Sequence, residues 1–273
     1  MSSTRRRAST YPTYRLPSIA TIRVNTEGHY TVLIDASDIG TGAWTVLTQI
    51  AADALEAPVE CIHLEIGDSS LPNGAVAGGS AGTASWGTAI VEAARKLRER
   101  MREAQGVLPE GGLEVTAEGG MNPDAQRFAM YAFGAQFAEV RVNMDTGEVR
   151  VPRLLGVFGA GRIMNAKMAR SQLLGGMTMG LSMALHEQSV MDSGFGDYVN
   201  HDLAEYHIAT NADVGTIDVS WIEEDDPYVN PMGAKGIGEI GIVGTAAAIA
   251  NAVHHATGMR IRDLPITLDK LLS

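Results

Sequence analysis

The stretch Lys235-Gly236-Ile237-Gly238-Glu239 opens a run of small and apolar residues that ends near Thr257, and this pattern predicts a tight turn followed by a helix. Two glycines would let the main chain approach a bulky ligand closely, and the free N–H groups that open a helix favour an anionic group nearby. Glu239 is therefore the leading candidate for a catalytic base. The alternative is that Glu239 only complements the helix dipole, with the glycines as a simple connection.

Composition narrows the class of protein. The chain has 273 residues and a formal net charge of -11, which suits two modest domains and argues against nucleic-acid or anionic-membrane partners. No apolar run reaches the roughly 18 residues of a membrane span. The single cysteine, Cys61, excludes an internal disulfide framework, and no cysteine or histidine cluster predicts a metal-ligand set. We expect a cytoplasmic protein with small-molecule or protein partners.

Stretches with the apolar spacing of strands alternate with stretches that have the apolar spacing of helices. This pattern predicts an α+β fold with mixed sheets in two layered subdomains. We expect residues 1–17 to form a flexible lead-in, 18–112 the first subdomain and 113–273 the second. The predicted elements are strands at 19–24 and 30–36, helices at 43–56 and up to 103, a hairpin at 135–157, a helix at 165–186, an extended segment at 205–222, a helix to 257 stopped by Gly258, a strand at 260–265 and a short terminal helix.

Three further segments could serve the same ligand as Glu239. The turn Gly40-Thr41-Gly42 precedes a helix, so its N–H groups and hydroxyl could hold phosphate or amide edges. The stretch 78–85 is rich in glycine and hydroxyl residues and also opens a helix, although helix capping alone would explain Ser80 and Thr83. The segment 161–165, followed by Gln172, offers a cation and two amides, although Asn165 could be a plain N-cap.

Two other patterns have structural explanations. Met177, Met179 and Met183 lie among Leu, Gly and Ala at helical spacing, which predicts flexible core residues and not a metal-binding stripe. The acidic run 223–226 predicts a solvated loop and not a metal site.

In their order and separation, these segments resemble the C-terminal cofactor-binding half of the large molybdenum subunit of the xanthine dehydrogenase and aldehyde oxidase family. The likeness covers roughly residues 18–273 and is nearest to the bacterial aldehyde oxidoreductase branch. In that branch the first turn reads Gly-Thr-Gly, as here, in place of the Gly-Gln-Gly of many xanthine dehydrogenases. Further matching stretches lie at 45–49, 200–206 and 247–265.

The resemblance implies a molybdenum hydroxylase that oxidises an aldehyde or N-heterocycle with water as oxygen source. Glu239 falls on the family's catalytic glutamate, which takes a proton during the reaction. The implied cofactor is a molybdenum–molybdopterin dinucleotide, with the cytosine form expected. The positions that match the family's cofactor contacts are Gly40, Thr41, Gly42, Thr83, Ala84, Arg162, Ile163, Met164, Asn165, Ala166, Lys167, Met168, Gln172, Lys235, Gly236, Ile237 and Gly238.

The resemblance also implies partner chains. The family's large subunit is normally more than twice this long, so we expect its N-terminal half on another chain, together with an iron–sulfur subunit and an FAD subunit that carry electrons away. The purified chain alone is then expected to be inactive. The alternative is a truncated, non-catalytic remnant, or a cofactor-holding or assembly module.

Overall fold

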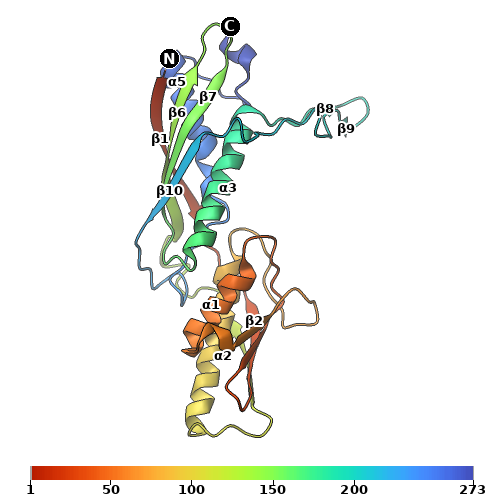
Figure 1. Cartoon of the computed structure of the whole chain (residues 1–273), viewed down its shortest axis with the longest axis vertical. Coiled ribbons are helices and arrows are strands. Elements are labelled where there is room, and N and C mark those ends of the chain that lie inside the picture. The colour runs from red at the N-terminus through yellow and green to blue at the C-terminus, as the bar shows by residue number, and fades with distance from the viewer. Residues whose placement is uncertain (1, 273) are drawn as a thin grey trace.

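The computed structural model describes residues 2–272, with side chains described from Ser9 onward. The chain folds into two lobes that follow one another along its longest axis (Figure 1). Each lobe has its own buried apolar cluster, so each is stabilised by a separate hydrophobic core. Both lobes combine a mixed sheet with helices, which confirms the predicted α+β class.

The first lobe packs helices α1 (Ala43–Leu55) and α2 (Gly82–Glu103) against a four-stranded sheet of order β4-β3-β2-β5. Small side chains on α2, such as Ala89 and Ala93, are fully buried and let the helix lie close to the sheet. A short 3-10 helix, η1 (Val59–Cys61), precedes β4. The strands of this sheet are β2 (Ser18–Val24), β3 (Tyr30–Leu33), β4 (Ile62–Glu65) and β5 (Leu113–Gly119).

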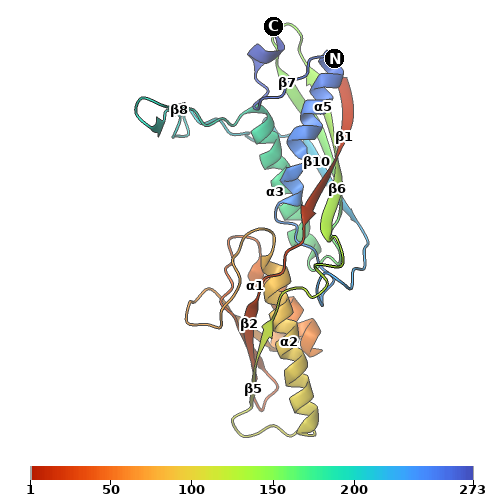
Figure 2. The same ribbon diagram turned by 180° about the vertical axis from the view of Figure 1, so that it is seen from behind.

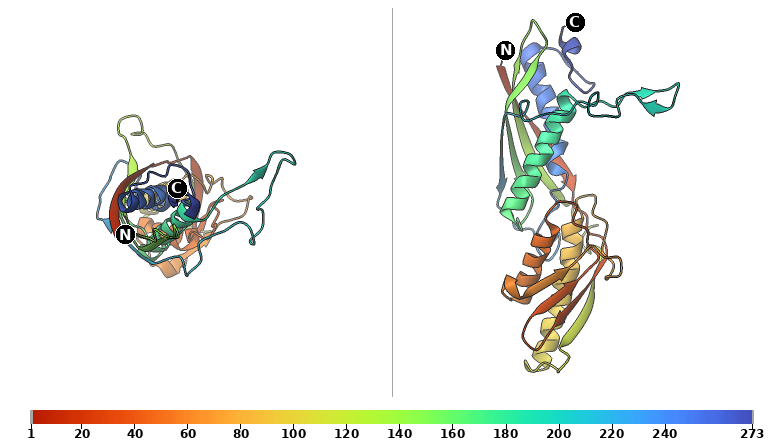
Figure 3. Two further views of the ribbon diagram at one scale, coloured as in Figure 1. Left: turned by 90° about the horizontal axis from the view of Figure 1, so that it is seen from above. Right: turned by 45° about the vertical axis from the view of Figure 1, so that its right-hand side comes forward.

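The second lobe curves a sheet of order β1-β6-β7-β10 around two helices. Helix α5 (Thr245–Thr257) packs on β1 and β6, while α3 (Ala166–Leu185) packs on β7 and β10, so both helices cover one face (Figure 3). A short helix, α4 (Ile240–Val243), leads into α5, and η2 (Leu268–Leu271) closes the chain. The strands are β1 (Ser2–Pro12), β6 (Tyr131–Val142), β7 (Val149–Gly159) and β10 (Thr216–Ile222).

Two predicted boundaries need correction. Residues 2–12 of the expected flexible lead-in form a strand, because β1 pairs antiparallel with β6 from Ser2 opposite Arg141 to Pro12 opposite Tyr131. Main-chain hydrogen bonds to the long strand β6 hold β1 in place. Its own sequence therefore needs no alternation of apolar residues. The first lobe also extends past residue 112, since β5 returns to pair with β2. The division between the lobes therefore follows Gly119.

Several predicted elements are confirmed and others are not. The 135–157 hairpin, the 165–186 helix and the stop at Gly258, which has a left-handed φ of 79°, are all present. In the extended segment only Thr216–Ile222 forms a strand, and 260–265 forms none. Of the three methionines only Met177 is buried, because Met179 and Met183 face outward on α3.

Residues 187–209, here called the arm, leave the second lobe after α3. They contain a small hairpin of β8 (Met191–Asp192) and β9 (Asp197–Tyr198). Figures 1 and 2 both show this hairpin projecting away from the sheet and its helices. Across residues 2–272 no helix is both long enough and apolar enough to cross a bilayer.

Candidate active site between the lobes

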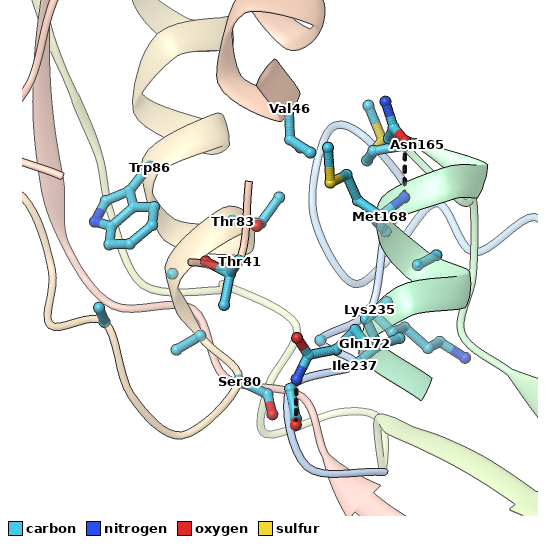
Figure 4. Close-up of a pocket in the computed structure, with 18 of the residues that line it drawn as sticks. Thr41, Val46, Ser80, Thr83, Trp86, Asn165, Met168, Gln172, Lys235 and Ile237 are labelled. Carbon is cyan, nitrogen blue, oxygen red and sulfur yellow. Dashed lines mark hydrogen bonds between the residues drawn. The ribbon is translucent and has the colours of Figure 1, made fainter. Parts of the chain in front are cut away.

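A cavity of about 320 Å³ lies where the two lobes meet. Its walls come from the α1 and α2 starts in the first lobe and from the α3 start and the 234–239 turn in the second (Figure 4). The structure thus brings together the four segments that the sequence singled out. The predicted residues that line the cavity are Thr41, Thr83, Arg162, Ile163, Met164, Asn165, Met168, Gln172, Lys235, Gly236, Ile237, Gly238 and Glu239.

Five predicted cofactor residues are outside this lining. Gly40 lies in the turn before α1, and Gly42 begins that helix with a left-handed φ of 79°. A Cβ on Gly42 would lie 2.8 Å from the Met168 sulfur, so this glycine lets the two lobes approach each other. Ala84 is buried inside α2, whereas Ala166 and Lys167 are exposed on the first turn of α3.

The backbone N–H groups of the first glycine turn already have an acceptor. One Asp38 carboxylate oxygen accepts from Gly40 and Gly42 at 2.9 and 3.2 Å, and the other accepts from Trp44 at 3.2 Å. Burial alone would raise the pKa of Asp38, but hydrogen bonds from Trp44, Gly40, Gly42 and Thr41 outweigh it and lower that pKa. In this structure the Gly40 and Gly42 N–H groups, which were expected to hold phosphate or amide edges, donate to Asp38.

A close contact with Ser80 requires glycine at positions 236 and 238, before Glu239. A Cβ on Gly236 would lie 2.0 Å from the Ser80 carbonyl oxygen, and one on Gly238 would lie 2.8 Å from its hydroxyl oxygen. That hydroxyl accepts a hydrogen bond from the Glu239 N–H at 3.0 Å. Ser80 has no capping bond to α2, whose N-cap is Ala81. It instead holds the Glu239 turn of one lobe against the other lobe.

Two predicted cations are paired within the chain. Arg162 donates to Asp53 at 2.8 Å, which links the second lobe to α1. The Lys235 ammonium is 5% exposed and pairs with Glu224 and, at 3.2 Å, with Asp226. The acidic run is thus not simply a solvated loop, because these two carboxylates neutralise a buried lysine. Figure 4 shows the Lys235 side chain extending away from Thr41 and Thr83, so its backbone lines the cavity.

The amide residues fix the second lobe's side of the cavity. Asn165 accepts from the Met168 N–H at 2.9 Å, which confirms its alternative assignment as the N-cap of α3. Its amide nitrogen donates to Gln49 in α1 at 3.0 Å, across the junction. Gln172 donates to the Gly238 carbonyl at 2.9 Å and so holds the turn before Glu239 (Figure 4).

Glu239 is one of the residues that line the cavity. Its backbone N-caps the short helix α4, but its side chain makes no capping bond. The Oε2 atom is buried and has no hydrogen-bond partner among the described residues. Burial, then the charge of Glu239, then a hydrogen bond to Glu239 raise the pKa of the Tyr11 hydroxyl. Tyr11, from the strand predicted to be flexible, is therefore a neighbour of the candidate base.

Sequence reasoning missed other residues at this site. Ile39, Val46 and Trp86 form apolar parts of the cavity wall. The Trp86 indole N–H donates to the Ala75 carbonyl at 2.8 Å. No sequence motif identifies Asp38 or Tyr11. The role of Asp38 depends on the geometry of the turn before α1, and the position of Tyr11 depends on the pairing of β1 with β6. No cluster of three or more metal-ligating side chains occurs within the described part of the chain.

Comparison with known proteins places these features in a family. The model of the molybdopterin cofactor-binding domain matches residues 2–121 and 111–215. The chain is 42% identical to the aldehyde oxidoreductase molybdenum-binding subunit PaoC of Escherichia coli K12, over 93% of the chain and 38% of that protein. It is 30% identical to the probable hypoxanthine oxidase XdhD of the same organism, over 92% of the chain and 30% of that protein.

A solved structure shows the same fold. The aldehyde oxidoreductase of Desulfovibrio desulfuricans superposes with a TM-score of 0.85 at 27% identity, over 99% of this chain and 32% of that one. The chain spans under two fifths of the length of the curated relatives described above.

Proposed function

This chain belongs to the molybdopterin cofactor-binding domain family, and on that premise we propose that it forms part of a molybdenum hydroxylase. In this proposal the cavity between the lobes holds a molybdenum–molybdopterin dinucleotide, in its cytosine form. Glu239 acts as the general base in the oxidation of an aldehyde or N-heterocycle with water as the oxygen source. The likeness to two aldehyde oxidoreductases favours an aldehyde substrate.

One observation carries the proposal. Glu239 lines the cavity, and its buried Oε2 atom has no hydrogen-bond partner within the described chain, while the Tyr11 hydroxyl lies beside the same carboxylate. Burying a carboxylate oxygen without a partner is unfavourable, and such sites are retained where the group has a chemical task. An acceptor oxygen with free lone pairs can take a proton from a group placed in the cavity. The bound partner would also satisfy the oxygen that the chain leaves unpaired.

The lining fits a large ligand with both polar and apolar edges. Ligand pockets in proteins occupy about 300–1,000 Å³, so a cavity of about 320 Å³ is large enough for part of a dinucleotide. We propose that the Thr41 and Thr83 hydroxyls and the main chain at 236–238 contact its polar groups. Apolar side chains such as Met168 would cover a ring face. Arg162 and Lys235 would contribute through their main chain, because their cationic groups are already paired.

The chain's residues then have two tasks. Ser80 and Gln172 hold the turn so that the Glu239 carboxylate has a fixed position. Glu239 accepts one proton at Oε2 and returns it to solvent after turnover. When bound, the cofactor supplies the oxidation chemistry, in which an aldehyde and one water give a carboxylic acid, two protons and two electrons. We propose that the electrons pass to iron–sulfur and FAD subunits.

The test uses the assembled complex isolated from its host. Glu239→Gln preserves shape and size but cannot accept the proton, so aldehyde oxidation should fall at least a thousandfold while molybdenum and pterin content stay unchanged. Glu223→Gln, at an exposed position in the acidic run, is the matched control and should retain normal turnover. Near-normal turnover of the Glu239 variant would exclude its role as the base.

A second candidate function is a cofactor-holding or assembly module without catalysis. In this alternative the cavity between the lobes holds the cofactor, and Glu239 transfers no proton. In that case the complex would contain molybdopterin and show no turnover with any aldehyde or N-heterocycle. The same isolation with metal and pterin analysis separates the two functions.

A further inference from the structure

Strand β1 brings Tyr11 to the same junction as Glu239. The strand pairs with β6 from Ser2 to Pro12 and ends where the two lobes meet (Figures 1 and 2). Tyr11 is paired with Ala132, which is fully buried in the core of the second lobe. Residues directly opposite one another in an antiparallel pair share a face of the sheet. The Tyr11 side chain therefore points toward the helices that cover this face.

Other residues on this face hold β1 and β6 against α4. Side chains two positions apart on a strand share a face, so Ser9 faces the helices as Tyr11 does. Gln136 of β6 is fully buried, and its amide nitrogen donates to the Gly241 carbonyl of α4 at 2.6 Å. A Cβ on Gly244 would lie 2.1 Å from the Gln136 amide oxygen and 3.0 Å from the Ser9 Cβ. The short helix α4 is thus in close contact with both strands.

This packing places the Tyr11 hydroxyl beside the carboxylate of Glu239, the N-cap residue of α4. Burial, and after it the charge of Glu239 and a hydrogen bond to Glu239, raise the pKa of the hydroxyl. The buried Oε2 atom of Glu239 has no partner within the described chain, so the oxygen available to Tyr11 is Oε1. A bond to one oxygen fixes the rotation of a carboxylate and leaves the other oxygen free.

We propose that Tyr11 is a positioning residue for the candidate base: its hydroxyl donates to Glu239 Oε1 and so holds Oε2 ready to accept the proton. The inference rests on the proposed function, which assigns Glu239 as the base. A donor to one oxygen stabilises the ionised carboxylate, and a fixed acceptor loses less freedom during the reaction. Tyr11 is outside the cavity lining, so it acts through Glu239 and not on the cofactor or substrate.

A titration tests the contact in the full chain, labelled with isotopic carbon at the tyrosine Cζ atoms and followed by NMR. The resonance that is missing from Tyr11→Phe belongs to Tyr11. In Glu239→Gln this resonance should titrate at a lower pH than in the native chain, because the negative charge beside the hydroxyl is gone. The matched control is Tyr30, which is also half-buried against a core but lies in the first lobe, and its resonance should be unaffected. An unchanged Tyr11 midpoint would overturn the proposal.

Turnover of the assembled complex tests the role. Tyr11→Phe removes only the hydroxyl, so the molybdenum and pterin content should stay unchanged. The kcat for aldehyde oxidation should fall at least about tenfold, the effect of losing one hydrogen bond to a charged group, while KM changes little. Tyr30→Phe should keep the native kcat. A native kcat in Tyr11→Phe contradicts the positioning role, and loss of molybdenum or pterin from this variant would show a structural role in its place.

The positioning role and the proposed function can fail separately. Normal turnover of Glu239→Gln would contradict Glu239 as the base, whatever the Tyr11 titration shows. An inactive Glu239→Gln together with a fully active Tyr11→Phe would contradict only the role of Tyr11.

Discussion

The Ser80 hydroxyl oxygen accepts the Glu239 backbone N–H at 3.0 Å across the junction between the lobes. Ser80 has a left-handed φ of 53°, which is unusual for a residue with a side chain, and its carbonyl lies against Gly236. The position of the candidate base is therefore set by a residue of the other lobe. Any change that separates the lobes should move the Glu239 carboxylate relative to Thr41 and Thr83.

Two substitutions of Ser80 distinguish the contribution of its hydrogen bond to stability from the cost of its backbone strain. Ser80→Ala removes the acceptor and should lower the free energy of unfolding by about 0.5–1.5 kcal/mol. Ser80→Gly loses the same bond but relieves a left-handed conformation that costs about 1–2 kcal/mol in residues with a Cβ. The glycine variant should therefore be the more stable of the two in urea unfolding. Equal stability of both variants and the native chain would show that the contact is energetically unimportant.

Adding a methyl group at Gly236 should be damaging for a purely steric reason. A Cβ there would lie 2.0 Å from the Ser80 carbonyl oxygen, so main chain on one side must move. We expect Gly236→Ala to lower the free energy of unfolding by about 1–3 kcal/mol, the range for overpacked sites. Gly111→Ala is the matched control, since a Cβ there meets nothing within 4 Å. A Gly236 variant as stable as the control would contradict the close approach.

Asp38 makes the start of α1 sensitive to acid. Its pKa is held below the ordinary value of 3.8, so its contribution is complete above about pH 3.8 and is lost as the pH falls through the lowered pKa. Asp38→Ala should cost about 0.5–2 kcal/mol at neutral pH, as for other lost helix caps. Asp38→Asn retains an acceptor without the titration, so its acid unfolding curve should lack this component. The comparison is made by circular dichroism between pH 7 and pH 2.

The parts of the fold that sequence reasoning could predict were those with local signals. The helix that begins after Asn165 has an N-cap and helical spacing, and the hairpin around Gly147 has alternating apolar positions. Strand β1 has neither, because it is defined by main-chain pairing with β6. The boundary at residue 112 was wrong for the same reason, since β5 pairs with β2 from a distant part of the sequence.

The candidate site shows the same limit at the level of single residues. Glycines at 236 and 238 were predicted to let the main chain approach a ligand closely, and within this chain they let it approach Ser80. A glycine in a motif can indicate that a Cβ is not tolerated at that position. It does not indicate which group the Cβ would meet. In the same way, the sequence offers Arg162 and Lys235 as cofactor contacts without showing that Asp53 and Glu224 pair with their charges after folding.

Lys235 offers the sharpest test of that pairing. Its ammonium is 5% exposed between the carboxylates of Glu224 and Asp226, and Glu224 also accepts the Gly161 N–H at 2.9 Å. Lys235→Met leaves two partly buried carboxylates uncompensated and should cost about 3 kcal/mol, near the lower end for broken buried pairs because both acids retain some solvent contact. Adding Glu224→Gln should restore part of this loss.

Lys96→Met, at an exposed position on α2, is the control and should change stability little. The measurement is urea unfolding at pH 7 arranged as a double-mutant cycle. Additive losses for the Lys235 and Glu224 changes would show that the two groups are not coupled.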